Sequence, residues 1–240
     1  KTTPYANNPR MGIAGEENGR AILGTVPVES DGSARFTVPA LKPLLFQALD
    51  KDGFAYQTMR TVTYVQPGES VSCVGCHENR MTATPHANPM AMRREPSTIT
   101  PRPFEGRPFS FVESVQPVLD RHCVQCHGKE KTEGKMDLTG VRAGAWTRSY
   151  ASLTRNPKLV PRYAARNQIQ TTPVGGVYGA LGSGLMKMLR QGHEKVKLSG
   201  EELRLLAAWI DCNAIFYGTP NPTDQARQIK GEPAPMPEIQ

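Results

Sequence analysis

Two copies of the pattern Cys-x-x-Cys-His constrain this chain more than any other feature of its sequence. The first copy is Cys73–His77 and the second is Cys123–His127. Two thiols at this spacing can form thioether bonds to the two vinyl groups of a haem, and the adjacent imidazole can bind the iron. The sequence therefore predicts two covalently bound haem c groups. The expected attachment residues are Cys73, Cys76, Cys123 and Cys126, and the expected proximal ligands are His77 and His127.

Zinc and disulfide chemistry are the alternatives for these cysteines. Zinc ribbons usually place their two Cys-x-x-Cys pairs about 15 to 20 residues apart, whereas Cys76 and Cys123 are much further apart in the chain. A disulfide within one pair would close almost no loop and would stabilise little. Cys212 stands outside both motifs and is expected to pack as a small apolar residue. Haem is favoured, and structural zinc or a dithiol redox pair are the other interpretations.

The sixth position of each iron decides between an electron carrier and a catalyst, because a second strong ligand closes the site to substrate. For the second haem the expected ligand is His193, in the charged loop 192–198. Met186 and Met188 are the alternatives there, and a surface histidine is the simpler interpretation of His193. For the first haem the candidate ligand is His86. An open or weakly occupied sixth position is the competing expectation at that haem.

The first half of the chain has β character. Short runs typical of strands occupy residues 20–66, and Asp31-Gly32 and Asp52-Gly53 stand where hairpins need residues that tolerate positive φ. We expect a β-rich domain over residues 1–81, folded as a small β-sandwich or meander that carries the first haem. The proline-rich stretch 82–109 is expected to be a linker or an extended wrap.

The second half has helical patterns. Ser110 and Ser199 each precede an acidic residue by three positions, which is the spacing of a capping box. Pro117 is expected to kink or restart the first of these helices, and apolar residues from Leu203 to Ala214 recur at helical intervals. The fold class is therefore predicted to be α+β. The units expected here are a cytochrome c-like helical domain over 110–218, carrying the second haem, and an extended tail over 219–240.

Charge and hydropathy limit the partners. The formal net charge is +7, but the basic residues are scattered and nothing suggests a nucleic-acid platform. We expect a solvated basic surface that steers an acidic redox partner protein or other haem subunits, within an oligomer or a larger complex. No stretch approaches about 20 apolar residues, so no membrane span is expected. Because haem is attached to thiols outside the cytoplasmic membrane, a periplasmic or extracellular location is predicted.

Several blocks of the sequence resemble a known family. In the second half, Val115–Leu119 and Trp209–Asp211 are similar to the cytochrome c domains common in planctomycete-type proteins. The first half resembles the middle and C-terminal parts of the alpha subunit of hydrazine synthase and its relatives. The blocks that carry this second resemblance are residues 24–28, 31–34, 46–50, 57–60, 66–69 and 72–78.

The resemblance implies a catalytic haem in the first half and a bis-histidine electron-transfer haem in the second. The second assignment carries over onto His127 and His193. For the first, the family's iron ligand is a tyrosine four residues after the motif histidine, and Met81 stands at that position here.

Three functional hypotheses follow. The leading one is a dihaem cytochrome that transfers electrons between its two haems and a redox partner. The alternative is a haem enzyme related to hydrazine synthase that acts on a small nitrogen or oxygen species at the first haem. A scaffolding module in a multihaem assembly is the third.

Overall fold

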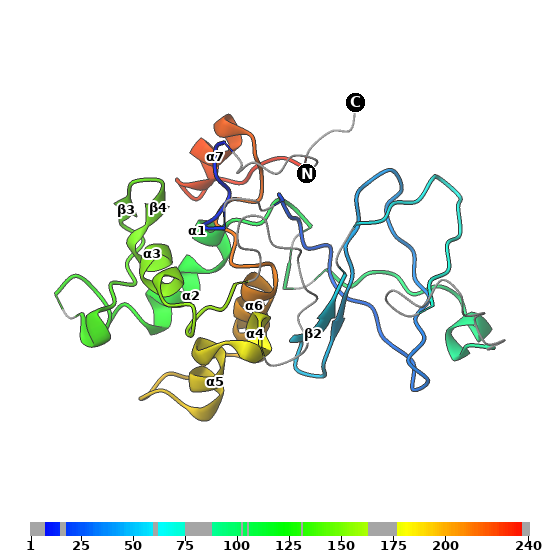
Figure 1. Ribbon diagram of the computed structural model, residues 1–240, viewed down its shortest axis with the longest axis horizontal. Helices are drawn as coiled ribbons and strands as arrows, with labels where there is room; N and C mark the ends of the chain where they lie inside the picture. The colour runs from blue at the N-terminus through cyan, green and yellow to red at the C-terminus, as the bar shows by residue number, and fades with distance from the viewer. Residues whose placement is uncertain are drawn as a thin grey trace.

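The molecule has two parts that lie side by side in Figure 1, one mainly helical and one built from extended segments. The computed structural model describes residues 8–14, 18–59, 62–74, 88–101, 103–104, 106–130, 132–162 and 177–236. Residues between 18 and 101 form the β-rich part, and most of the residues after 106 form the helical part. This mixture of helices and small sheets agrees with the predicted α+β class.

A hairpin is the regular element of the β-rich part. Strand β1 (Gln47–Leu49) pairs antiparallel with strand β2 (Ala55–Thr58). In the turn, the Gly53 N–H donates to the Asp50 carbonyl at 3.0 Å, and the Asp50 N–H donates to the Phe54 carbonyl at 2.8 Å. Gly53 has φ = +86°, a conformation that glycine adopts without steric cost. The predicted turn at Asp52-Gly53 is confirmed.

The other extended segments pair less than expected. Prolines such as Pro39 and Pro43 interrupt the runs, and proline has no N–H to donate to a strand ladder. Within the described residues of 20–66, the expected sandwich or meander is therefore reduced to the β1–β2 hairpin and isolated bridges. The isolated bridges of the β-rich part pair Ala21 with Pro108, Thr25 with Thr100, Phe36 with Ser97 and Leu44 with Thr63.

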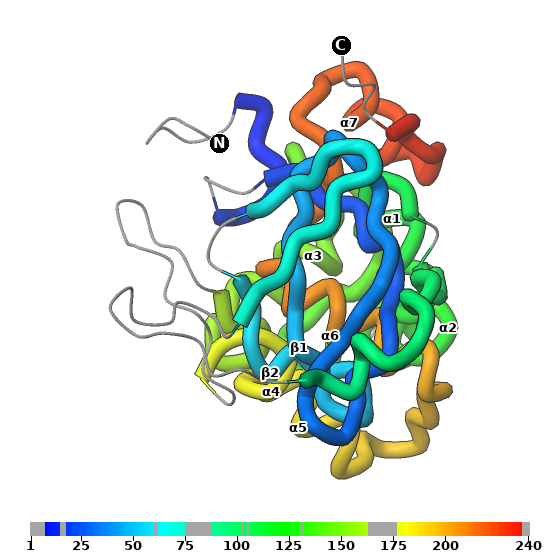
Figure 2. Tube along the Cα trace, turned by 90° about the vertical axis from the view of Figure 1, so that its right-hand side faces the viewer, coloured from blue at the N-terminus to red at the C-terminus, as the bar shows by residue number. Residues whose placement is uncertain are grey.

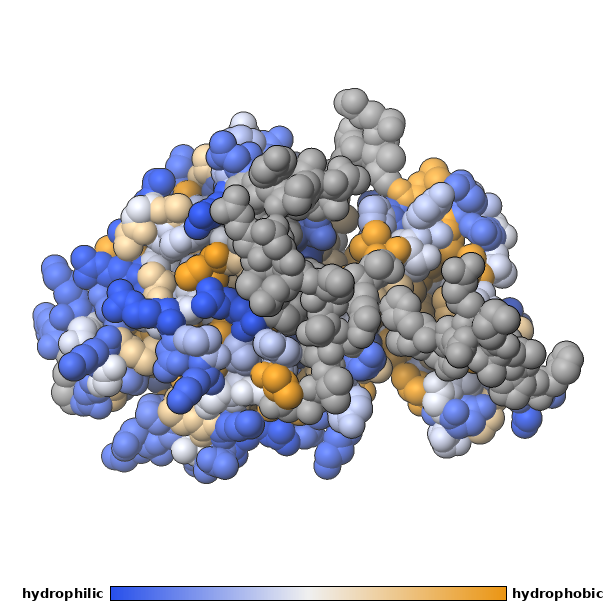
Figure 3. Space-filling model, in the orientation of Figure 1, coloured by the Kyte–Doolittle hydropathy of each residue, from blue (hydrophilic) through white to orange (hydrophobic). Residues whose placement is uncertain are grey.

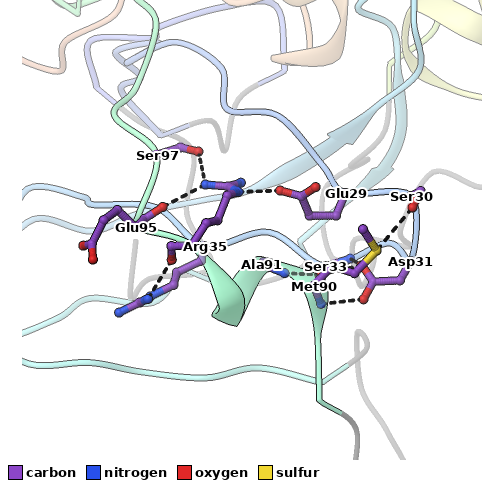
Figure 4. Close-up of polar contacts among 10 residues, drawn as sticks. Glu29, Ser30, Asp31, Ser33, Arg35, Met90, Ala91, Glu95 and Ser97 are labelled. Atoms are coloured by element: carbon purple, nitrogen blue, oxygen red, sulfur yellow. Dashed lines mark hydrogen bonds and ion pairs between the residues drawn. The ribbon is translucent and has the colours of Figure 1, made fainter.

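Residues 88–101 run beside the earlier segments of the β-rich part, where Ser97 pairs with Phe36 and Thr100 with Thr25. The 3-10 helix η1 (Met90–Arg93) starts here, and its Met90 N–H donates to the Asp31 carboxylate at 2.8 Å (Figure 4). The Ala91 N–H donates to the Ser33 hydroxyl at 3.0 Å. Hydrogen bonds from Met90 and Ser33 lower the pKa of Asp31 to about 2. This polar network fastens residues 88–101 to the Asp31-Gly32 turn.

The helical part contains short helices connected by loops. Figure 1 shows α6 and α4 next to β2, and α2 and α3 on the far side from the β-rich part, whereas Figure 2 shows α7 and α5 at opposite ends. Among the described residues, no helix combines the length and the apolar character that crossing a bilayer requires. The helices are α1 (Phe111–Ser114), α2 (Gln116–His122), α3 (Arg148–Arg155), α4 (Gly179–Gly182), α5 (Gly184–Gln191), α6 (Gly200–Asp211) and α7 (Pro222–Gln228). Between α2 and α3 lie the 3-10 helix η2 (Glu133–Lys135) and the two-residue strands β3 (Arg142–Ala143) and β4 (Trp146–Thr147).

Capping side chains start α1 and α6 where the sequence predicts. The Ser110 hydroxyl accepts from the Glu113 N–H at 3.3 Å at the start of α1. Ser199 and Glu202 form a reciprocal capping box at the start of α6. The helix is interrupted at Val115, between α1 and α2, and Pro117 lies in the first turn of α2. The predicted helix starts and the predicted restart at Pro117 are confirmed.

An aromatic cluster forms the centre of the helical part. Phe111, Tyr150, Trp209 and Phe216 are fully buried, and the ring centroids of Phe111 and Trp209 are 5.2 Å apart. The Tyr150 hydroxyl donates to the Ala214 carbonyl at 2.6 Å, so its polar end is satisfied inside the core. This cluster packs α1, α3 and α6 together.

Two expectations for the C-terminal end are wrong. Helix α6 ends at Asp211 instead of continuing to Ala214, since Asn213 and Ala214 have φ of +62° and +51° and turn the chain back. The tail 219–240, expected to be extended, contains α7. Asn221 caps that helix, and a proline at the first helical position fits because its missing N–H has no partner there. Cys212 is buried at the end of α6, as expected.

The two parts of the molecule meet at Asp211. Its carboxylate accepts hydrogen bonds from the Ala55 N–H of β2 at 2.9 Å and from the Ala180 N–H of α4 at 2.7 Å. The Gln47 side chain of β1 donates to the Asp211 carbonyl at 3.0 Å. Burial raises the pKa of Asp211 to about 6, although these two N–H groups favour the charged form. The hairpin is thus docked on α6 and α4 by buried polar contacts.

Exposed apolar side chains concentrate on the β-rich part. In Figure 3 the left-hand, helical part is largely hydrophilic, and several hydrophobic patches appear at the right. Apolar side chains gathered on a surface are typical of a region that contacts another molecule. Between residues 28 and 92, the described large hydrophobic residues that are exposed are Val28, Leu41, Leu49, Tyr56, Val62, Tyr64, Val71, Val74, Met90 and Met92.

Candidate haem site

Helix α2 presents the second Cys-x-x-Cys-His motif. The Cys123 N–H donates to the Leu119 carbonyl at 2.8 Å, so the motif continues directly from the end of the helix. The N–H groups of Cys126 and His127 then donate to the Cys123 carbonyl at 3.2 and 2.9 Å. This turn brings both thiols and the imidazole into one short segment. Neither Cys123 nor Cys126 is in a disulfide, and burial raises the pKa of the Cys123 thiol to about 11.

A backbone carbonyl fixes the imidazole of His127. Its Nδ1 lies 2.8 Å from the Glu133 carbonyl oxygen. A carbonyl can only accept, so this contact requires the proton on Nδ1 in the neutral ring and leaves Nε2 as the free lone pair. Metal-binding histidines are commonly oriented by a second hydrogen bond of this kind. The loop that supplies Glu133 is closed by the Leu138 N–H, which donates to the His127 carbonyl at 2.7 Å.

The structure brings His193 to His127. Their ring centroids are 6.0 Å apart and their ring planes differ by 20°. Gly192, with φ = +100°, ends α5 and turns the chain so that His193 follows at once. The Val196 N–H donates to the His193 carbonyl at 3.0 Å and closes the following turn. Two histidines that are far apart in the sequence are therefore neighbours in space.

This separation fits a metal ion held between two imidazoles. An imidazole nitrogen binds a transition metal at about 2 Å and lies about 1 Å from its own ring centre, so two opposed imidazoles place their ring centres about 6 Å apart. The histidine pair, with Cys123 and Cys126 beside His127 in the motif, is a donor set that would suit a c-type haem with two histidine ligands.

The two methionine alternatives to His193 lie in or against the hydrophobic core. Among the residues that the structure describes, no three His, Cys, Asp or Glu side chains gather closely enough to hold a metal ion. Met186, one alternative to His193, is buried in the hydrophobic core, and Met188 packs against that core. His193 is the candidate that the structure sets beside His127.

His122 has a role that the sequence did not reveal. Its Nε2 lies 3.0 Å from Glu202 Oε1, and its side chain is mostly buried. Partial burial works against the charge of Glu202, yet hydrogen bonds from Ser199 and His122 lower the pKa of Glu202 to about 2. The contact ties the end of α2, which carries the motif, to the start of α6.

The first motif is only partly described. Cys73 is exposed, and Val71 and Val74 beside it are exposed as well. Cys76, His77 and His86 lie outside the described residues, as does Met81. The first haem site therefore stays a prediction from the sequence.

Comparison with known proteins supports the family suggested by the sequence blocks. The family model for the hydrazine synthase alpha subunit middle domain matches residues 7–78. Hydrazine synthase subunit alpha of Kuenenia stuttgartiensis is 25% identical over an alignment of 272 positions, which covers 85% of this chain and 34% of that protein. The chain is therefore similar to the hydrazine synthase alpha subunit, and residues 7–78 are similar to its middle domain.

The fold is similar to that of a solved structure. The solved hydrazine synthase of Kuenenia stuttgartiensis matches with a TM-score of 0.57 and 22% sequence identity, over 85% of this chain and 34% of that chain. The chain thus spans about a third of the length of the hydrazine synthase alpha subunit that it matches. The matched family region contains the whole first motif, Cys73–His77.

Proposed function

We propose that this hydrazine synthase alpha-like chain is part of a dihaem c-type cytochrome that transfers electrons between its two haems and a redox partner. The observation that carries the proposal is the 6.0 Å separation of the His127 and His193 rings. An iron with an imidazole on each side has no open position for substrate, and such an iron serves as an electron carrier.

Four side chains and one carbonyl would hold the second haem. Cys123 and Cys126 would supply the thioether bonds, and His127 and His193 would bind the iron. The Glu133 carbonyl accepts from Nδ1 of His127, which directs Nε2 to the iron and makes the imidazole a stronger donor. When bound, the haem supplies reversible one-electron chemistry.

At the first haem, Cys73, Cys76 and His77 are proposed to play the corresponding roles, with His86 as the sixth ligand. The support is the motif itself and its position inside the region that matches the hydrazine synthase family model. Two haems in one chain give an electron a path from one part of the molecule to the other.

The alternative function is an oxidoreductase related to hydrazine synthase. It is favoured by the family match over residues 7–78, which includes the first motif. In this alternative Cys73, Cys76 and His77 would hold a haem that supplies redox chemistry toward a small nitrogen or oxygen species. The residues of the second motif would hold the haem that exchanges electrons with it.

We also propose a periplasmic or extracellular location and assembly with other subunits. The location follows from thioether attachment, which takes place outside the cytoplasmic membrane. The curated relative is named as a subunit, and the exposed apolar side chains of the β-rich part offer a surface for a partner.

Spectroscopy of the purified ferric protein separates the two functions. If the chain is a carrier, both haems give low-spin signals. A high-spin component in the wild-type protein that binds cyanide, nitric oxide or hydroxylamine favours the enzyme.

A pair of variants tests the ligation that the proposal needs. His193→Ala is expected to convert the second haem from low spin to high spin and to let carbon monoxide bind the reduced iron. His122→Ala is the matched control, because His122 adjoins the same motif but contacts Glu202. An unchanged low-spin spectrum in His193→Ala contradicts the proposal.

A further inference from the structure

The tip of the β1–β2 hairpin contacts Arg190 at the end of α5. The Arg190 Nη2 donates to Asp52 Oδ2 at 2.8 Å. The guanidinium carbon of Arg190 also lies 4.9 Å from the ring centroid of Phe54. Phe54 is 2% exposed and belongs to the hydrophobic core. One arginine of the helical part is therefore held by an ion pair and a cation–π contact from the β-rich part.

The hairpin tip is itself firmly placed. The Asp50 carboxylate accepts from the N–H groups of Asp52 and Phe54, both at 2.9 Å. Gly53 packs so closely on α6 that a Cβ atom there would lie 2.8 Å from the Cγ atom of Arg204. Ala55, the first residue of β2, is anchored too, because its N–H donates to the buried carboxylate of Asp211. Asp52 and Phe54 thus present a fixed surface to Arg190.

Arg190 stands at the point where α5 gives way to the loop of His193. It lies in the last turn of α5, and only Gln191 and Gly192 separate it from His193. Both intervening residues are exposed. The other end of α5 is fixed within the helical part, since the Ser183 hydroxyl donates to the Leu159 carbonyl at 2.7 Å and caps the helix. The hairpin contact holds the opposite end.

We propose that Arg190 is a positioning residue for His193, and that Asp52 and Phe54 of the hairpin hold it in place. This inference rests on the proposed ligation of the second haem by His193. An exposed ion pair adds little to global stability, so its effect is expected in geometry. An iron ligand must be held to within about 0.5 Å of its binding position by the residues that support it.

The contact with Arg190 couples the two parts of the molecule. The β-rich part contains the first motif, and its β1–β2 hairpin holds the C-terminal end of α5. His193, the proposed sixth ligand of the second haem, follows directly after that end. A displacement of the hairpin is therefore expected to weaken the His193–iron bond at the second haem.

Variants of Arg190 in the holoprotein test the inference. Arg190→Ala is expected to raise the fraction of high-spin second haem at least severalfold above wild type and to increase carbon monoxide binding to the reduced protein. Arg190→Lys keeps the cation and is expected to restore most of the low-spin signal. Arg148→Ala is the matched control, because it breaks a comparable surface ion pair, Arg148 to Asp137 at 3.0 Å, elsewhere in the helical part.

A second variant removes the partner instead of the arginine. Phe54→Leu keeps apolar volume in the core but removes the ring under the guanidinium, and it is expected to shift the spectrum in the same direction as Arg190→Ala. If His193→Ala opens the second haem whereas Arg190→Ala and Phe54→Leu leave it low-spin, the positioning role is overturned and the ligation stands. If His193→Ala itself has no effect, the ligation and the positioning role both fall.

Discussion

Asp211 in α6 and Ala55 in β2 form a buried hydrogen bond that joins the two parts of the molecule, with the Ala55 N–H donating to Oδ2 at 2.9 Å. Asp211 is 3% exposed. The same carboxylate accepts from Ala180, yet burial dominates and raises its pKa to about 6, with Asp50 adding a like charge. The junction between the parts therefore contains a carboxyl group that titrates in mildly acidic solution.

Stability is expected to fall as the pH rises from about 4 to about 6. The pKa of Asp211 is about 6 in the folded protein against 3.8 for the ordinary group, so the folded state holds a proton that the unfolded state has lost. Above pH 6 the folded protein carries the buried negative charge of Asp211, which lowers the free energy of unfolding by at most about 3 kcal/mol. Urea unfolding at several pH values measures this slope.

Asp211→Asn is neutral at every pH and is expected to remove that slope. Asp224→Asn, on α7, is the control and should keep it. A variant Asp211→Asn whose stability still falls between pH 4 and 6 as in the wild type would show that another group is responsible.

Replacing Gly53 by alanine tests the docking of the hairpin on α6. Gly53 has φ = +86° and would place a Cβ 2.8 Å from the Cγ of Arg204, whereas Gly32 has φ = +82° with nothing within 4 Å. Both alanine variants suffer the backbone cost of positive φ, about 1–2 kcal/mol. Gly53→Ala is expected to lose more stability than Gly32→Ala in chemical unfolding. Equal losses would mean that contact with α6 adds nothing.

Local signals in the sequence predicted the helices of the site. Each of these signals acts within one helical turn, so it can be predicted without knowledge of tertiary contacts. They are the capping side chains of Ser110 and Ser199 and the helix interruption near Pro117. The tail was misread because its prolines suggested an extended chain, although Asn221 followed by Pro222 is a cap followed by a favourable first helical residue.

Contacts between distant segments could not be predicted in this way. The need of a haem for a sixth ligand favours His193 in the sequence. The orientation of its neighbour His127 is set by the Glu133 carbonyl, however, and no sequence pattern predicts that contact. The contacts of Arg190 with Asp52 and Phe54 likewise depend on how the β-rich part docks on the helical part. Strand content was overestimated because β propensity alone does not provide a partner strand.

Glu202 is expected to stabilise the protein against acid. Its folded pKa is about 2 against 4.5 for the ordinary group, so its contribution is fully present above pH 4.5 and is lost as the pH falls through about 2. Glu202→Gln should therefore reduce the loss of stability between pH 5 and 2. Glu201→Gln, an exposed neighbour in the same helical turn, is the control. An acid titration of unfolding that is identical in wild type and Glu202→Gln would contradict this assignment.

Replacement of cysteines distinguishes covalent haem from every other use of the two motifs. The double variant Cys123→Ala/Cys126→Ala removes both thioether positions of the second site and is expected to lower the intact mass by one haem, because neither vinyl group can then be bonded to the chain. Cys212→Ala is the control, since Cys212 is buried at the end of α6 and belongs to neither motif. That variant should keep two haems. A wild-type mass equal to that of the bare polypeptide, or a double variant that retains both haems, would leave these cysteines with a different chemistry.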